Sequence, residues 1–168
     1  MKKTFNYILL GGILISVIFY TYTKLTAASN GNMAPDFEAE LIDGTPFKLS
    51  NLQGKYVLLD FWGSWCAPCI KESPDLVALH NKHSKDLTVV TVALEKNLKS
   101  WEKVTTKYGY TWKHQIVNQN RFVLLSDIAR KYGVSEIPSK FLIAPDGTLL
   151  GNYSFKEIDE ILNNKNLD

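Results

Sequence analysis

The sequence has very little cysteine: two residues among 168, Cys66 and Cys69, separated by two positions. Two cysteines are too few for a scaffold held together by disulfides, and a four-ligand zinc site would have to recruit histidines, of which there are three. The chain also lacks a basic run. Residues 1–28 hold three lysines and no acid, so the rest is close to neutral, which argues against a nucleic-acid partner.

Repeats and low-complexity segments are missing too. The composition is that of a globular protein, with 45% hydrophobic and 21% charged residues, so extensive disorder is excluded. A chain of 168 residues suits one domain with an appendage.

Charge is absent from Phe5 to Tyr22, directly after a basic start. A helix of this length rises about 27 Å, close to the thickness of a bilayer's hydrocarbon core. We therefore expect residues 1–26 to form an N-terminal transmembrane helix, with a cleaved signal peptide or a buried core helix as alternatives. The lysines before it place the amino terminus in the cytoplasm and the domain in the periplasm or outside. Residues 27–33 are interpreted as a tether and residues 34–168 as the domain.

The order of expected elements indicates an α/β fold. Two apolar runs, residues 56–62 and 87–94, have the length of buried strands, and each precedes a helical pattern. Asp43-Gly44 predicts an N-terminal hairpin, and Pro145-Asp146-Gly147 predicts a second hairpin before a closing helix at residues 156–163. Strand–helix–strand followed by a hairpin and a helix describes a mixed sheet flanked by helices.

The two cysteines lie where the first apolar strand gives way to a helical pattern. Two intervening residues let their sulfurs meet across the first helical turn and form a disulfide. The helix start stabilises a Cys66 thiolate, so Cys66 is expected to attack a substrate disulfide. Cys69, one turn further, is expected to be more buried and to resolve the mixed disulfide.

Other interpretations of the pair remain. His80 and His83 lie three apart on the same expected helix, so half a zinc site completed by histidines is conceivable. A strand–CxxC–helix arrangement favours redox chemistry, in which case the histidines are expected to be solvated surface residues.

Two acids accompany the cysteines. Asp60 lies at the end of the apolar strand. If it is buried, its pKa is raised and it could accept a proton from Cys69. A solvated acid at a strand end is an equally good interpretation. Glu72 shares a helix face with Cys69 and could tune the site, although a solvated glutamate is the commoner case. Pro74 should kink or split the helix.

Over about Ala34 to Asn163 the sequence resembles the thioredoxin superfamily, and within it the membrane-anchored TlpA/ResA-like thiol–disulfide oxidoreductases. The resemblance implies a thioredoxin-like fold, with a central mixed sheet flanked by helices and an N-terminal β-hairpin extension. The matching stretches are Ala34-Pro35-Asp36-Phe37, Asp60 to Cys69, Lys71-Glu72-Ser73-Pro74, Tyr132-Gly133-Val134, Ile137-Pro138-Ser139 and Phe141 to Gly147.

The resemblance also implies roles for single residues. Asp60 corresponds to the buried acid of thioredoxins, and Glu72 to an acid that tunes the dithiol and contacts substrate. Pro138 corresponds to the proline of the cis-proline loop, whose backbone pairs with a substrate peptide, and Ile137 would face Cys66. Trp65 is expected to cover the apolar side of the site and contact substrate.

The implied function is that of an enzyme, a membrane-tethered extracytoplasmic thiol–disulfide oxidoreductase that reduces protein disulfides, with cytochrome c maturation as one setting. It would use no cofactor beyond the Cys66–Cys69 pair and no metal, and a membrane electron donor of the DsbD/CcdA kind would re-reduce it. In thioredoxins a lysine accompanies the buried acid, and here Thr91 takes that position, so proton handling at Asp60 is open.

Two other functions are weighed against this one. A thiol peroxidase of the peroxiredoxin-related class needs a threonine or serine three residues before its cysteine, where this chain has Gly63. A copper-binding redox chaperone uses a wider cysteine spacing than the one here.

Overall fold

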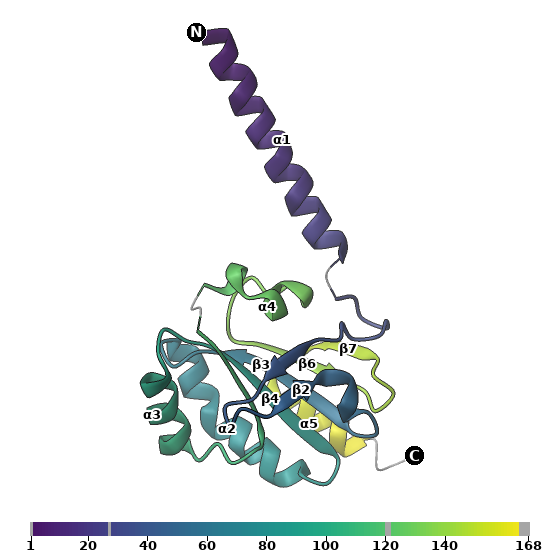
Figure 1. Ribbon diagram of the computed structural model, residues 1–168. Coiled ribbons are helices and arrows are strands. Elements are labelled where there is room, and N and C mark those ends of the chain that lie inside the picture. The colour runs from purple at the N-terminus through teal and green to yellow at the C-terminus, as the bar shows by residue number, and fades with distance from the viewer. Residues whose placement is uncertain (1, 27, 120–121, 165–168) are drawn as a thin grey trace.

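The computed structural model describes residues 2–26, 28–119 and 122–164, and it confirms the expected thioredoxin-like α/β fold (Figure 1). The central sheet has the strand order β5-β4-β3-β6-β7. The pairs β3·β4 and β4·β5 are parallel, whereas β6 pairs antiparallel with β3 and β7 pairs antiparallel with β6, so the sheet is mixed as expected. The strands are β3 (Tyr56–Trp62), β4 (Leu87–Leu94), β5 (His114–Asn118), β6 (Ser139–Ile143) and β7 (Leu149–Asn152).

Helices cover the sheet at four places in the described part of the domain. The longest, α2, follows β3 directly and α5 closes the fold; the helices are α2 (Ala67–His83), α3 (Leu98–Tyr108), α4 (Asp127–Lys131) and α5 (Phe155–Asn164). The closing helix therefore starts one residue before the expected start and ends one residue after the expected end. α2 continues through Pro74, so the proline does not split it. Leu76 and Leu79 of α2 are buried beyond the proline, and this packing holds the second half of the helix on the sheet.

Alternate residues of β3 enter two separate cores, as the two-residue period of a strand requires. Val57, Leu59 and Phe61 pack with the N-terminal hairpin and the α4 region. Leu58 and Trp62 pack beneath α2 and α5. Asp60 shares their face of the strand, so the central strand brings one acid into the core under α2.

The predicted N-terminal hairpin is present. β1 (Glu38–Glu40) pairs antiparallel with β2 (Pro46–Lys48), and a short 3₁₀ helix, η1 (Leu49–Leu52), follows. Gly44 has φ 81° in the turn, a conformation that favours glycine. The Phe37 and Phe47 rings lie 5.7 Å apart in a tilted arrangement and cover the sheet face opposite α2.

Residues 28–34 are hydrogen-bonded to the domain. The Ala28 N–H donates to the Lys131 carbonyl, Gly31 donates to Leu149, and Leu149 donates back to Asn32. The Ala34 N–H donates to the Gly147 carbonyl, and Met33 forms a β-bridge to Thr148. This segment therefore follows the outer edge of β7 and shields an otherwise open strand edge.

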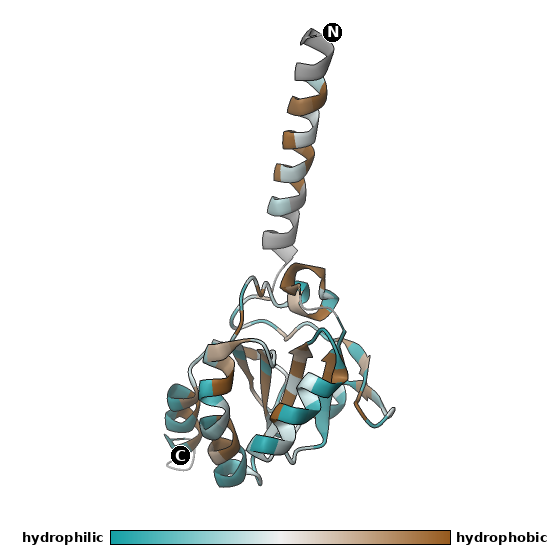
Figure 2. Ribbon diagram, turned by 90° about the vertical axis from the view of Figure 1, so that its left-hand side faces the viewer, coloured by the Kyte–Doolittle hydropathy of each residue, from teal (hydrophilic) through white to brown (hydrophobic). Residues whose placement is uncertain are grey.

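The apolar amino-terminal segment forms a helix, α1 (Lys2–Thr26), that extends away from the sheet (Figures 1 and 2). Its described apolar side chains are exposed, Ile8 by 74% and Leu14 by 61%, so the alternative of a buried core helix is wrong. The expected transmembrane helix is not supported: within the described residues, no helix has the length and apolar character needed to cross a membrane. Residues 1 and 27 of the expected anchor and tether, and residues 165–168 of the domain, lie outside the described residues.

Candidate active site

The connection between β3 and α2 carries the cysteine pair. Cys66 has extended backbone angles and is the N-cap of α2, and its Sγ accepts a hydrogen bond from the Cys69 N–H at 3.3 Å. Pro68 is the second residue of the helix. Proline has no backbone N–H, so it suits the first turn, where such groups lack a partner within the helix. The sequence Cys66-Ala67-Pro68-Cys69 thus places the Cys66 sulfur at the start of α2, where the backbone N–H groups of the first turn have no partner within the helix.

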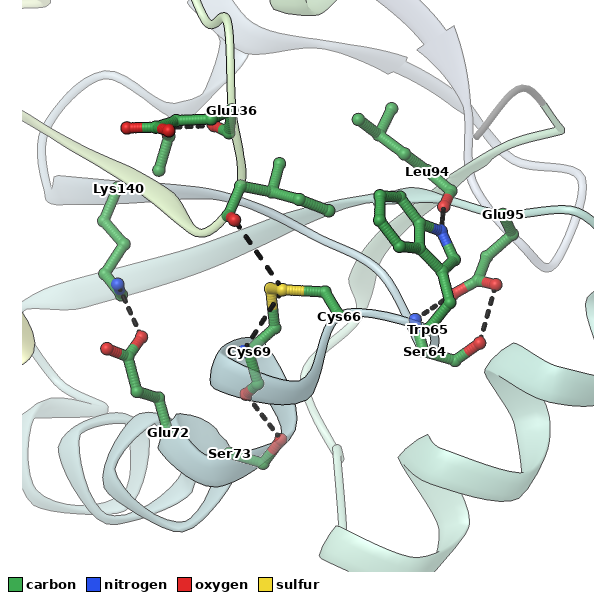
Figure 3. Close-up of a disulfide and its surroundings, with 12 residues drawn as sticks. Ser64, Trp65, Cys66, Cys69, Glu72, Ser73, Leu94, Glu95, Glu136 and Lys140 are labelled. Atoms are coloured by element: carbon green, nitrogen blue, oxygen red, sulfur yellow. Dashed lines mark hydrogen bonds and ion pairs between the residues drawn. A yellow bond between two sulfur atoms is a disulfide. The ribbon is translucent and has the colours of Figure 1, made fainter. Parts of the chain in front are cut away.

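Cys66 and Cys69 form a disulfide, with their Cα atoms 5.3 Å apart (Figure 3). The expected contrast in burial is wrong for this oxidised form, because each cysteine is 5% exposed. Their surroundings differ instead. The Cys66 Sγ lies 3.7 Å from the Ile137 carbonyl oxygen, whereas Cys69 lines a small internal cavity.

The residues before Cys66 are pinned to the end of β4. The buried Glu95 carboxylate accepts hydrogen bonds from the Ser64 N–H at 2.6 Å and the Ser64 hydroxyl at 2.8 Å. The Trp65 indole N–H donates to the Leu94 carbonyl at 2.7 Å. Burial raises the pKa of Glu95, and the bonds from Ser64 oppose that rise. Sequence analysis did not identify Glu95; its signal was an acid directly after the second apolar strand.

Gly63 has no room for a side chain. A Cβ atom at this position would lie 2.8 Å from the Trp65 Nε1 and 3.0 Å from the Leu94 carbonyl oxygen. The hydroxyl that a peroxiredoxin-related peroxidase needs at this position therefore could enter only if the Trp65–Leu94 contact shifted. The geometry weighs against the peroxidase alternative.

The expected substrate-binding residues gather beside the disulfide. The Ile137–Pro138 peptide bond is cis, and the loop places the Ile137 carbonyl oxygen 3.7 Å from the Cys66 Sγ. Trp65 is 44% exposed next to Cys66, and Ile137 is half-buried. An apolar side chain and a backbone carbonyl thus border the sulfur that would attack.

Asp60 is buried, 3% exposed, so the alternative of an acid in water is wrong. Burial raises the pKa of Asp60 to about 7, with Lys140 acting to lower it and Glu72 to raise it. The Asp60 Oδ1 has no hydrogen-bond partner within the described part of the chain. Asp60, Glu72 and Cys69 line a common cavity of about 10 Å³, close to the space that one water molecule needs.

Lys140 is the functional candidate that the sequence analysis missed. In the register of the sheet Asp60 lies between Thr91 on β4 and Lys140 on β6. Thr91, at the position where thioredoxins have a lysine, accepts a hydrogen bond from the Trp112 indole. In this chain the lysine beside Asp60 comes from the strand on the other side, β6. The Lys140 Nζ lies 2.7 Å from the Glu72 Oε2 (Figure 3). Its sequence signal was a lysine at the start of an apolar strand.

The two histidines of α2 contact Asp159 and Trp112. His83 is buried, with its Nε2 2.6 Å from the Asp159 Oδ1 on α5, so the expectation of a solvated residue is wrong for it. His80 is partly buried, with its ring 5.3 Å from that of Trp112. Among the residues the structure describes, no group of three His, Cys, Asp or Glu side chains could hold a metal ion.

Comparison with known proteins gives consistent matches over the domain. The model of the AhpC/TSA family matches residues 30–151. Thiol-disulfide oxidoreductase ResA of Geobacillus thermodenitrificans is 32% identical over 80% of this chain and 78% of its own length. ResA of Bacillus subtilis is 33% identical over 89% of this chain and 84% of its own.

A solved structure agrees with these relatives. The thioredoxin domain of a thiol-disulfide oxidoreductase from Bacteroides vulgatus superposes with a TM-score of 0.69 and is 25% identical. The superposition covers 80% of this chain and 99% of the Bacteroides vulgatus domain. The resemblance to ResA-like oxidoreductases inferred from the sequence is confirmed.

The buried carboxyl of Asp60 predicts a dependence of stability on pH. Because its pKa is raised from 3.8 to about 7, the unfolded chain releases this proton at lower pH than the folded protein. This contribution makes the folded protein less stable as the pH rises from about 4 to about 7. We expect Asp60→Asn to remove that loss and to raise the free energy of unfolding at pH 8 by on the order of 4 kcal/mol.

Denaturant unfolding of the oxidised protein at pH 4 and pH 8 measures this effect. At pH 4 the carboxyl is protonated in the folded protein, so the variant and the parent should be similar there, which serves as the internal control. An equal advantage of Asp60→Asn at both pH values would show that the raised pKa is not the cause.

Proposed function

Because the chain belongs to the AhpC/TSA family and is a thiol–disulfide oxidoreductase, we propose that it works as a reductant of protein disulfides outside the cytoplasm. The observation that supports this most is the Cys66–Cys69 pair at the start of α2, bordered by the Ile137 carbonyl and backed by Asp60 and Glu72. The redox group of the proposed reaction is this cysteine pair.

The proposed reaction begins with the reduced pair. The Cys66 thiolate attacks one sulfur of the substrate disulfide, and the other substrate sulfur leaves as a thiolate that takes a proton from solvent. The Cys69 thiol then passes its proton to Asp60, and the resulting thiolate attacks Cys66. The bond between Cys66 and the substrate breaks, the second substrate thiol is released, and two electrons have moved to the substrate.

The charge around the sulfurs supports the proposed direction of exchange. A couple oxidises strongly when its reduced, thiolate form is stabilised. The Cys69 N–H stabilises a thiolate at Cys66. The Ile137 carbonyl oxygen and the carboxyl groups of Asp60 and Glu72 act against negative charge at the dithiol. Two buried or half-buried acids therefore favour the disulfide form of the protein, which makes the dithiol a reductant.

A redox titration tests this direction. Equilibration against glutathione or dithiothreitol buffers should give a midpoint below about −200 mV, well under the roughly −120 mV of a strongly oxidising foldase. A midpoint near or above that of the oxidising foldases would contradict the reductant assignment.

We propose that the substrate is an extended peptide lying across the Ile137–Pro138 loop. This loop carries a backbone carbonyl 3.7 Å from the Cys66 Sγ, and the exposed Trp65 provides apolar contact beside it. Backbone pairing of this kind is tolerant of sequence, which suits protein substrates. Reduction of the haem-binding cysteines of apocytochrome c is one reaction that such a site could perform.

Cysteine variants test the assignment of the two sulfurs. Cys69→Ser should accumulate substrates as mixed disulfides with Cys66, because the resolving sulfur is gone. Cys66→Ser, its matched control, should accumulate none. Trapped partners are recovered by reduction of affinity-purified protein and identified by mass spectrometry. Capture of the same partners by both variants would contradict the assignment of Cys66 as the nucleophile.

We further propose that α1 holds the protein at a membrane, where a membrane electron donor of the DsbD/CcdA kind re-reduces it. Many exposed apolar side chains on one helix are unfavourable in water and are typical of contact with a membrane or another protein. An outward-facing compartment tends to oxidise thiols, so a reductant there needs such a donor.

Fractionation of cells tests the attachment. The full chain should sediment with membranes and be released by detergent and not by high salt, whereas a chain lacking residues 1–26 should stay soluble. A membrane-impermeant maleimide should label the dithiol in intact spheroplasts after reduction. Recovery of the full chain in the soluble fraction would contradict the membrane attachment.

A further inference from the structure

The apolar strand β6 carries one lysine, Lys140, whose side chain is 8% exposed. We propose that Lys140 is a positioning residue for proton transfer at Cys69: its ammonium group compensates Glu72 and leaves the Asp60 carboxylate able to accept the Cys69 proton. The inference depends on thiol exchange between Cys66 and Cys69, and not on the direction in which the protein works.

Register places the lysine beside the acid. Asp60 and Lys140 are opposite residues of the antiparallel pair β3·β6, so their side chains leave the sheet on the same face. The Lys140 Nζ then lies 2.7 Å from the Glu72 Oε2, and 4.7 Å from the centre of the Phe155 ring. The ammonium group thus pairs with a carboxyl from α2 (Figure 3), and its charge also acts on the Asp60 carboxyl of the neighbouring strand.

The groups that face Asp60 come from several elements. Cys69 and Glu72 belong to α2, Lys140 belongs to β6, and Tyr110 follows α3. From β4 the neighbouring residue is the uncharged Thr91. Lys140 is the single cation in this set of described neighbours. Burial and Glu72 raise the pKa of Asp60, and Lys140 is the group that lowers it.

The role follows from this balance. The resolving step needs Asp60 as a carboxylate, because only that form can accept the proton of the Cys69 thiol. Without the ammonium group, two carboxyl groups in a buried site would share no compensating charge, and Asp60 would keep its proton to higher pH. The fraction of molecules ready to resolve a mixed disulfide near neutral pH would then fall.

The resolving step can be measured alone. Reduced full-length protein reacts with 5,5′-dithiobis(2-nitrobenzoic acid), releasing one thionitrobenzoate when Cys66 attacks and a second when Cys69 displaces the group bound to Cys66. Absorbance follows both releases, and the rate of the second against pH gives the midpoint of the resolving step. Each release forms one sulfur–sulfur bond and breaks another.

Lys140→Met keeps the aliphatic stem and removes the charge. We expect it to move the midpoint upward by about one pH unit and to slow the second release roughly tenfold below the midpoint. Lys140→Arg should restore the parental midpoint, and Glu72→Gln should move it downward. Lys82→Met is the matched control: it removes another lysine–carboxylate pair, Lys82–Asp159, and should leave the midpoint unchanged.

A double variant separates this role from a structural one. In an Asp60→Asn background, Lys140→Met should cause no further shift, because the acceptor it acts on is absent. An unchanged midpoint in Lys140→Met, or the same shift with and without Asp60, would overturn the proposal. If Lys140→Met fails to fold by circular dichroism, Glu72→Gln and Lys140→Arg decide the question in its place: a downward shift of the midpoint in Glu72→Gln with a parental midpoint in Lys140→Arg supports the proposal, and an unchanged midpoint in Glu72→Gln overturns it.

Discussion

The register of β3 is the constraint on which the site depends. The strand alternates between two cores, and Asp60 stands on the side of α2 with Cys69 and Glu72. A shift by one residue would turn Asp60 toward the N-terminal hairpin and bring Leu59 under the helix. The same register determines that Lys140 of β6 lies opposite Asp60. Strand pairing therefore decides which charged side chain accompanies this acid.

The core beneath α2 carries an energetic conflict. It is built of large apolar side chains, yet it contains a carboxyl that burial disfavours in its charged form. A well-packed neutral residue would be more favourable for folding at neutral pH. An acid beside Cys69 therefore lowers stability at neutral pH while its pKa lies at about 7, a combination that is common at sites of proton transfer.

The sequence was most informative where the signal was local. Hydrophobic periodicity located the strands and helices, and the CxxC spacing located the disulfide. Lys140 and Glu95 were missed because their importance depends on cross-strand register and on the return of β4 to the cysteine loop, neither of which a linear pattern specifies. Residue spacing could not decide whether Asp60 is a buried acid or a solvated one, since its burial depends on which face of the sheet α2 covers. The burial of His83 likewise depends on Asp159, which lies far away in the sequence.

The hydrogen bonds that residues 28–34 make to the end of α4 and to the chain that enters β7 have a mechanical consequence. Residues that are hydrogen-bonded to the domain cannot extend as a flexible linker. The linker between α1 and the domain that carries the dithiol is therefore short. A protein that holds α1 would meet the cysteines within a short distance of that helix and at a high local concentration. The geometry of the attachment would therefore select partners by where they present their disulfide, before any contact at the cysteines selects them by sequence.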